Sequence, residues 1–206
     1  MFSMEREQLQ RQGIYVPREL GAWADGLTVH EAASGRRLDD VFYELLKSKN
    51  RLGVLDLVNR VCDAQIAIEQ ASEHQHGDFT TVNILWDVER ERLNIIDWEW
   101  KAKYPPYFDL YSFLRSVGYL NNSWHWRESN AARMLRSFRE TFMEENWFHE
   151  IVKWRISVYQ GFSVAADPYK GLVDYLTITR DRYKGKHDAH NFFGQYAYML
   201  RILEAR

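Results

Sequence analysis

Hydrophobic positions recur at helical spacing along most of the chain. Leu55, Val58, Cys62 and Ile66 are three or four residues apart, which predicts an amphipathic helix in front of the central region. Three later ranges have the same spacing and predict helices with an apolar stripe in the core: 131–142, 147–162 and 192–203. In the second of these ranges the expected core stripe consists of Trp147, Ile151, Trp154, Val158 and Phe162.

Capping residues indicate where several helices begin. Asp167-Pro168 is a helix start, because Asp accepts hydrogen bonds from unpaired backbone N–H groups and Pro fits the first helical position. Asp109 is expected to cap a helix that ends near Gly118, and Asp188 or Asn191 is expected to cap the last one.

A strand pattern interrupts the helices between residues 82 and 96. The ranges 82–86 and 93–96 are β-branched and apolar, and the charged run 87–92 between them predicts a hairpin. Asn83 then begins the first strand and Asp97 ends the second, so both lie at the same end of the hairpin. A small hairpin followed by four or five packed helices indicates an α+β fold that is mostly helical.

Composition narrows the class of protein without deciding it. The 206 residues are 46% hydrophobic and 27% charged, which suits one large globular domain. The net charge of -2 gives no basic field for nucleic acid or an anionic membrane surface. The single Cys62 cannot form an internal disulfide, the first residues contain no apolar leader, and no apolar run could span a bilayer. We therefore expect a cytoplasmic protein with no membrane and no nucleic-acid partner.

The candidate chemistry lies in the loop before the hairpin and in the residues after it. The ranges 76–85 and 96–99 read His-Gly-Asp-x-x-x-x-Asn-Ile-Leu and Ile-Asp-Trp-Glu. Phosphoryl transfer from Mg-ATP needs a carboxylate to orient the attacking hydroxyl and oxygen ligands to hold magnesium. Asp78, Asn83 and Asp97 supply these groups in that order and are expected to converge at one end of the hairpin.

A metal-dependent hydrolase is the competing interpretation of the same loop. His74, His76 and Asp78 alternate as metal ligands do in some hydrolases, but Phe79 stands where a further ligand is expected. The remaining histidines show no paired spacing, which weighs against this site. We expect His76 to hydrogen-bond the loop backbone.

The two motifs resemble the aminoglycoside phosphotransferase and choline kinase branch of the protein-kinase-like superfamily. The resemblance implies that Asp78 is the catalytic Asp, with His76 beside it in the catalytic loop, and that Asn83 and Asp97 bind Mg²⁺. It implies ATP as the second cofactor and a small-molecule hydroxyl, on an aminoglycoside, amino alcohol or sugar, as the acceptor. The segment 105–111 resembles the one in which an Asp, here Asp109, braces the catalytic loop.

Upstream segments resemble the interlobe hinge of that family. The ranges 14–17 and 27–35 are similar to the approach to the hinge and to the hinge itself, where the backbone pairs with adenine. The implied cofactor-binding residues are Val29, Glu31 and Ala32. The resemblance divides the chain into a small-lobe remnant with the hinge, 1–34, and a helical kinase-like C-terminal lobe with the catalytic loop, 35–206.

One family feature has no counterpart. The phosphate-covering loop and its phosphate-contacting lysine precede the hinge in this family, whereas the first lysine here is Lys47. The range 4–12 resembles the small-lobe helix, with Glu5 or Glu7 as partners for the absent lysine. We expect the chain to begin inside the small lobe, and a partner chain or missing N-terminal segment to complete the nucleotide site. A non-catalytic kinase-like module, or half of a split enzyme, is therefore the alternative to an active kinase.

Aromatic residues supply weaker substrate candidates. Trp98, Glu99 and Trp100 follow Asp97 directly, and aromatic walls beside a carboxylate suit a sugar or a cationic alcohol. Trp124-His125-Trp126 lies in a polar connection where an acceptor pocket could form between helices. Most of the eight Trp residues are nevertheless expected to pack in the core.

Overall fold

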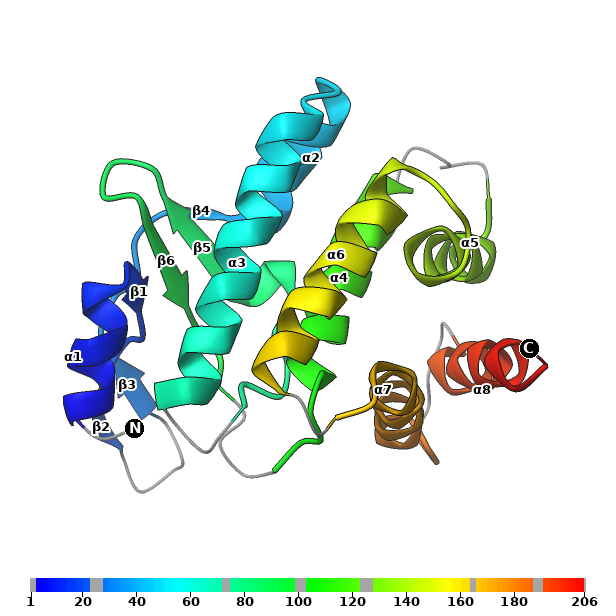
Figure 1. Ribbon diagram of the computed structural model, residues 1–206. Coiled ribbons are helices and arrows are strands. Elements are labelled where there is room, and N and C mark those ends of the chain that lie inside the picture. The colour runs from blue at the N-terminus through cyan, green and yellow to red at the C-terminus, as the bar shows by residue number, and fades with distance from the viewer. Residues whose placement is uncertain are drawn as a thin grey trace. The chain divides into compact units, whose positions relative to one another are not determined.

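The chain divides into two compact units, residues 1–102 and 103–206. The computed structural model describes residues 3–22, 28–71, 75–98, 103–122, 128–163, 166–186 and 191–205. The predicted division after residue 34 refers to the lobes of a kinase-like fold and stays a prediction. We describe the two units separately (Figure 1).

The first unit combines helices with a small sheet. Its elements are α1 (Ser3–Arg11), β1 (Ile14–Tyr15), β2 (Glu19–Ala22), β3 (Thr28–His30), β4 (Arg36–Arg37), α2 (Leu38–Lys47), α3 (Arg51–Ala71), the 3-10 turn η1 (Thr81–Asn83), β5 (Ile84–Asp87) and β6 (Arg92–Ile95). The sheet order is β1-β6-β5-β4, and only the β1–β6 pair is parallel. Strands β2 and β3 form a separate antiparallel pair.

Two predicted helices of this unit are confirmed. Helix α1 covers nearly all of the range 4–12, and α3 contains the apolar stripe that begins at Leu55. The stripe faces the interior, since Val58 and Cys62 are almost fully buried. Cys62 is a free, buried thiol, as expected.

The predicted hairpin is confirmed, with a correction at its start. Val82 and Asn83 belong to η1, so the first strand begins at Ile84 and not at Val82. The reason is local: the Asn83 backbone N–H donates to the Thr80 carbonyl at 3.0 Å, which closes a turn before the ladder starts. The turn of the hairpin is also shorter than predicted, because Asp87 and Arg92 pair as the last residues of the two strands.

The two faces of the hairpin differ in chemistry because side chains alternate along a strand. One face carries the hydrophobic residues Ile84, Trp86, Leu93 and Ile95, which pair across the ladder. The other face carries Leu85, Asp87, Arg92 and Asn94. Asp87 and Asn94 are buried despite being polar, so any hydrogen-bond partners of these side chains have to come from within the protein.

The second unit is built from helices over its described residues. They are α4 (Phe108–Asn121), α5 (Asn130–Phe142), α6 (Trp147–Phe162), α7 (Pro168–Arg182) and α8 (Phe192–Glu204), which confirms the predicted helices. Asp167 accepts hydrogen bonds from the Tyr169 and Lys170 N–H groups and so caps α7 as predicted. Asn191 caps α8 through the Gly194 N–H, whereas Asp188 lies outside the described residues.

The predicted core stripe of α6 is wrong by about one residue. The residues buried on α6 are Phe148, Val152, Arg155 and Tyr159. Trp154 and Phe162 of the predicted stripe are instead 48% and 38% exposed. Both stripes have helical spacing, and a tertiary partner selects between them. The Tyr159 ring packs 4.4 Å from the Tyr107 ring, and its hydroxyl accepts a hydrogen bond from the Tyr107 N–H.

The start of α4 also differs from the prediction. Tyr107 is the N-cap residue, in a left-handed conformation with φ 70°, and Asp109 lies inside the first turn. Asp109 is 2% exposed, so its carboxylate is buried at the positive end of the helix dipole. The expectation that Asp109 caps the helix is therefore wrong, because the buried aromatic Tyr107 fixes the helix start two residues earlier.

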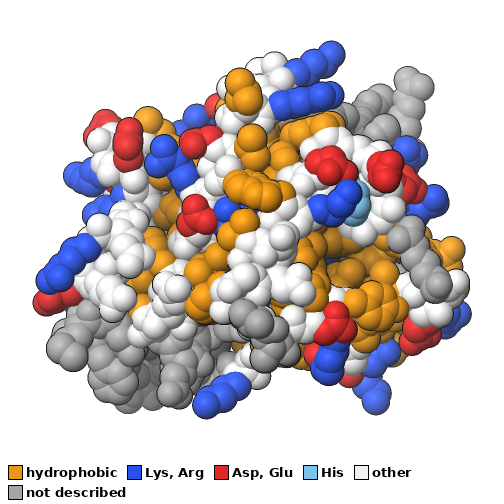
Figure 2. Space-filling view, in the orientation of Figure 1, with side chains coloured by type: hydrophobic (Ala, Val, Ile, Leu, Met, Phe, Trp, Pro, Cys, Tyr) orange, Lys and Arg blue, Asp and Glu red, His pale blue; other side chains and the backbone are white. Residues whose placement is uncertain are grey.

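The surface carries both signs of charge. On the face in Figure 2, acidic and basic side chains are interspersed among hydrophobic ones, in agreement with a net charge of -2. Within the described part of the chain, every helix is too short or too polar to cross a bilayer.

Candidate active site

Asp78 and Asn83 are joined directly by hydrogen bonds. The Asn83 side-chain amide donates from Nδ2 to the Asp78 carbonyl oxygen at 2.9 Å and to its carboxylate Oδ2 at 2.8 Å. Asn83 is 7% exposed and Asp78 is half-buried. Because Nδ2 is committed to Asp78, Oδ1 is the Asn83 atom left for a cation, and no hydrogen bond within the described residues reaches it.

His76 fastens this loop to the end of β6. Its ring is fully buried, Nε2 donates to the Ile96 carbonyl at 2.7 Å, and Nδ1 accepts from the Asp78 N–H at 3.2 Å. The rings of Phe79 and Trp98 lie 5.7 and 4.8 Å away. The expected backbone hydrogen bond is therefore present, and His76 acts on Asp78 by holding the loop.

The same bonds weigh against the metal-hydrolase interpretation. Both ring nitrogens of His76 already bind backbone groups, so neither offers a free lone pair to a metal. His74 lies outside the described residues. No three His, Cys, Asp or Glu side chains cluster as metal ligands in the described ranges.

Asp97 lies at the same end of the hairpin. The Ile96 N–H donates to the Asn83 carbonyl at 3.0 Å, which places Asp97 one residue beyond the position that pairs with Asn83. Asp97 is exposed and has φ 57°, a left-handed conformation that Asp tolerates better than most residues. The backbone of Asn83 and Asp97 thus lies at one end of the hairpin, with Asp78 bonded to Asn83, and the convergence of all three side chains stays a prediction.

In the predicted hinge, Glu31 has a structural partner. Its carboxylate is bound by the Arg18 guanidinium, by the Arg18 N–H at 3.1 Å and by the Tyr15 hydroxyl at 2.7 Å. These donors, first of all the Arg18 side chain, lower the pKa of Glu31 to about 2. The side chain therefore holds the segments before and after β2–β3 together as a permanent anion near neutral pH.

Val29 and Ala32, the other two predicted cofactor-binding residues, are exposed. Val29 belongs to β3 and is 38% exposed. Ala32 is exposed and lies in the connection after β3. Within the described residues, no hydrogen bond involves its backbone N–H or carbonyl group. A ligand with paired donors and acceptors could bind these groups.

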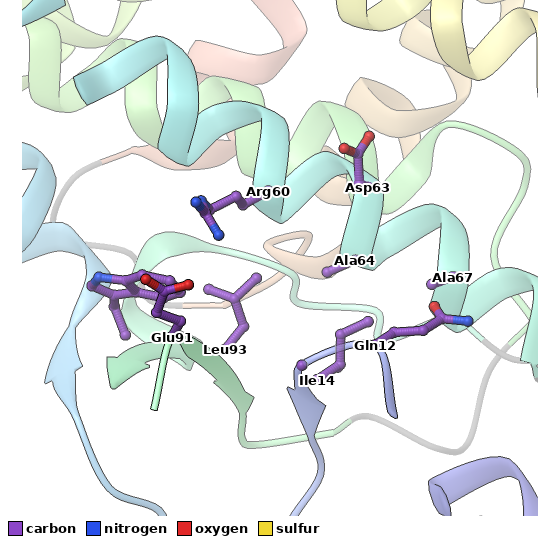
Figure 3. Close-up of a pocket in the computed structure, with 10 residues that line it drawn as sticks. Gln12, Ile14, Arg60, Asp63, Ala64, Ala67, Glu91 and Leu93 are labelled. Atoms are coloured by element: carbon purple, nitrogen blue, oxygen red, sulfur yellow. The ribbon is translucent and has the colours of Figure 1, made fainter. Parts of the chain in front are cut away.

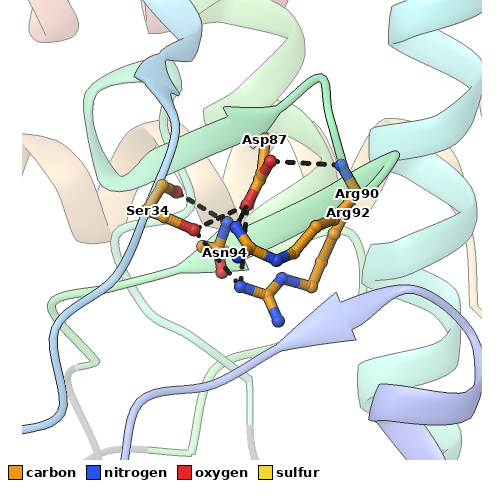
Figure 4. Close-up of polar contacts among 5 residues, drawn as sticks. All are labelled: Ser34, Asp87, Arg90, Arg92 and Asn94. Atoms are coloured by element: carbon orange, nitrogen blue, oxygen red, sulfur yellow. Dashed lines mark hydrogen bonds and ion pairs between the residues drawn. The ribbon is translucent and has the colours of Figure 1, made fainter.

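A polar cluster at the end of the predicted hinge was missed by sequence reasoning. Ser34, Asp87, Arg90, Arg92 and Asn94 form it, as Figure 4 shows. The Ser34 hydroxyl donates to Asp87 Oδ2 at 2.6 Å, and Arg90 contacts the same oxygen at 2.8 Å. Alternating polar residues in a strand that is otherwise apolar were the available signal.

The cluster predicts a pH dependence of stability. Hydrogen bonds from Ser34 and then Arg90 lower the pKa of Asp87 to about 2. An unfolded Asp titrates at about pH 4, so the stabilising contribution of Asp87 is full above that pH and is lost as the pH falls toward 2. In urea unfolding across this range, the free energy of unfolding of Asp87→Asn should fall less with decreasing pH than that of the parent. Asp40→Asn, an equal charge change at the exposed start of α2, should keep the parent's slope.

A pocket of about 290 Å³ lies on the opposite, apolar face of the hairpin. In Figure 3 its lining comes from α3, the turn before β1 and the hairpin. Arg60 and Asp63 border it on α3, and Trp86 and Leu93 on the strands. None of the predicted site residues lines it, so it is separate from the candidate active site.

The remaining predicted residues are less informative. Trp98 packs on His76 and donates from its indole N–H to the Ile95 carbonyl at 3.1 Å, which is a structural role. Glu99, Trp100 and the range 124–126 lie outside the described residues.

Asp109 belongs to the second unit, and its role as a brace of the catalytic loop stays a prediction. Glu7 lies 3.9 Å from Arg11 on α1, and the side chain of Glu5 is outside the described set.

A family model for the "phosphotransferase enzyme family" matches residues 8–145, which is 138 of the 206 residues. The chain belongs to this phosphotransferase family. The matched range contains the predicted hinge, the predicted catalytic loop, the hairpin and the start of the second unit. A comparison with curated proteins found no match. Family membership, the small hairpin and the helical second unit together confirm the predicted α+β, kinase-like fold.

Proposed function

We propose that this phosphotransferase family member moves the γ-phosphate of ATP to a hydroxyl group of a small molecule, with Mg²⁺ as the second cofactor. The observation that carries the proposal is the direct hydrogen bonding of Asn83 to Asp78 at the hairpin end that also bears Asp97. A structural module has no need for two acidic groups and an amide oxygen concentrated there.

The side chains at this end suit magnesium. Mg²⁺ prefers hard oxygen ligands and binds through few protein groups together with phosphate oxygens. The Asn83 Oδ1 and the Asp97 carboxylate would hold the ion, and Asn83 can do so without releasing Asp78 because it uses a different atom for each. The bound ion would offset the negative charge that builds on the phosphates during transfer.

Asp78 would act on the acceptor hydroxyl. Its carboxylate is half-buried and is held by the Asn83 amide, while its backbone N–H is held by His76. A carboxylate fixed in this way orients the hydroxyl for in-line attack and takes the proton late in the transfer. Positioning supplies most of the acceleration, because phosphoryl transfer needs little covalent chemistry from the protein.

The hinge would hold the adenine. Paired hydrogen bonds to adenine require an unused backbone N–H and an unused carbonyl group, and Ala32 has both within the described residues. Val29 offers an exposed apolar surface to a flat ring. Glu31 supports the segment through Arg18 and Tyr15, so its contribution to the nucleotide would come from its backbone.

The first experiment measures nucleotide binding by thermal unfolding. At a ligand concentration of 100 times Kd, the stabilisation is about 2.7 kcal/mol, which raises the Tm of a chain of this size by roughly 5–10 °C. We expect this shift with Mg-ATP and little or none with ATP plus a chelator. Asp97→Ala should lose most of the shift, since one of the two proposed magnesium ligands is removed.

The outcome separates the two function classes. A chelator-sensitive shift supports the enzyme, and incubation with labelled ATP and a panel of aminoglycosides, amino alcohols and sugars would then identify the acceptor. An unchanged Tm under both conditions would favour the non-catalytic module, or a nucleotide site that a partner chain has to complete.

A further inference from the structure

Ser34 follows the hinge and is held by three side chains of the catalytic hairpin. Its hydroxyl donates to Asp87 Oδ2 at 2.6 Å and accepts from the Arg92 guanidinium at 3.3 Å. Its carbonyl accepts from the Asn94 side-chain amide at 2.8 Å. Asp87 is 5% exposed and Asn94 is fully buried, so these bonds are partly shielded from water.

The backbone of the next residues also lies against the hairpin. Gly35 has φ 110°, and an ideal Cβ there would lie 2.7 Å from the carbonyl carbon and oxygen of Trp86. Arg36 and Arg37 then pair with Trp86 and Leu85 in the β4–β5 ladder. The exit of the hinge is therefore attached to β5 over four consecutive residues.

Arg92 extends this cluster to the entry of the hinge. Its guanidinium lies 3.7 Å from the Asp87 carboxylate and 4.6 Å above the Tyr15 ring. The Tyr15 hydroxyl in turn donates to Glu31. Ser34 is thus held by the hairpin directly and Glu31 through Tyr15, although Ala32 between them makes no hydrogen bond within the described residues.

The other end of the same hairpin bears Asn83 and Asp97. Strand β5 begins directly after Asn83 and ends at Asp87, a span of about 13 Å at the usual rise per residue. Every residue of β5 is paired with β6, which makes the hairpin a stiff connection. Its two ends therefore sit at a fixed separation.

We propose that Asp87, acting through Ser34, is a positioning residue that sets the distance between the adenine-binding hinge and the magnesium-binding end of the hairpin. The inference rests on the proposed function. One ATP molecule must reach both the hinge and the magnesium-binding end of the hairpin. It binds more tightly than its separate parts only if the distance between these two sites matches its length. The hydrogen bonds between Ser34 and the hairpin would set this distance.

The test compares whole ATP with its parts. Affinities for Mg-ATP, adenosine and Mg-tripolyphosphate are measured by calorimetry or ligand-observed NMR for the parent, Ser34→Ala and Asp87→Asn. Loss of one charge-assisted hydrogen bond to the hinge should weaken Mg-ATP by about tenfold. Adenosine and tripolyphosphate should bind as they do to the parent, and KM for ATP should rise more than kcat falls.

Two control variants make the result specific. Ser34→Thr keeps the hydroxyl and should restore the parent's affinity for Mg-ATP. Asp40→Asn removes an exposed carboxylate of α2 outside the cluster and should change none of the three affinities. Thermal unfolding of each variant shows whether the first unit remains folded at the assay temperature.

Each remaining outcome has one meaning. If Ser34→Ala and Asp87→Asn bind Mg-ATP like the parent, or if all three ligands weaken equally, the positioning role is wrong. If the parent binds tripolyphosphate and adenosine separately but gains nothing from their linkage in ATP, it is also wrong. If the parent binds none of the three ligands, the proposed function itself fails, and the positioning role fails with it.

Discussion

Asp78→Asn is expected to lower kcat for phosphoryl transfer by about 10²- to 10⁴-fold, the usual contribution of a positioned general base. The fold should survive, because the new amide oxygen can still accept the hydrogen bond from Asn83, and the backbone bonds of Asp78 do not involve its side chain. The KM for ATP should change little, since Asp78 is proposed to contact the acceptor hydroxyl.

The measurement is turnover of labelled ATP onto an acceptor, together with Mg-ATP binding. Asp40→Asn is the matched control, because it makes the same chemical change at an exposed site on α2. Parent-like turnover by Asp78→Asn would remove Asp78 from the reaction. Loss of nucleotide binding together with turnover would show that Asp78 serves the nucleotide site instead.

Gly35→Ala is expected to destabilise the first unit by roughly 3 kcal/mol or more, from a strained backbone and an overpacked contact. With φ 110° the position disfavours any residue with a Cβ. The added methyl would also lie 2.7 Å from the Trp86 carbonyl group, and backbone atoms within a paired strand cannot move aside as a side chain can. Urea unfolding of the purified chain measures the loss.

Gly13→Ala separates the two causes within the same unit. Gly13 also has a positive φ, 74°, but its nearest atom to an added Cβ is the Glu91 carbonyl oxygen at an ordinary 3.5 Å. Backbone strain alone should cost this variant about 1–2 kcal/mol. If the two variants lose the same free energy of unfolding, the contact between the added methyl group of Gly35→Ala and β5 adds nothing to the cost of backbone strain.

Structural features that depend only on residues close together in the chain could be predicted from the sequence. Helix periodicity located α3, α5 and α8, and the Asp167 and Asn191 caps bind N–H groups only two or three residues away. The closeness of Asp78 to Asn83 is of the same kind, since they are five positions apart in one loop, although their hydrogen bond came only from the structure. Such interactions form within a short segment, so the order of residue types is enough to predict them.

Local information also has an error of one or two residues at the ends of elements. It placed Asn83 in a strand rather than in the turn before it, and it made Asp109 a cap rather than a first-turn residue. The turn at Asn83 is decided by one local hydrogen bond to the Thr80 carbonyl, whereas a contact outside the segment decides the start of α4. Buried Tyr107 makes that choice at the start of α4.

The sequence by itself determined the family, the kinase-like order of elements and the position of Asn83 and Asp97 at one hairpin end. Only the tertiary structure decided which stripe of α6 is buried, because two stripes of equal spacing compete until a partner ring packs on one. It alone joined Ser34 to Asp87 and Asn94, which are 53 and 60 positions away along the chain. No local pattern encodes such a pairing, since it arises when separate strands come together and their buried polar groups must find partners.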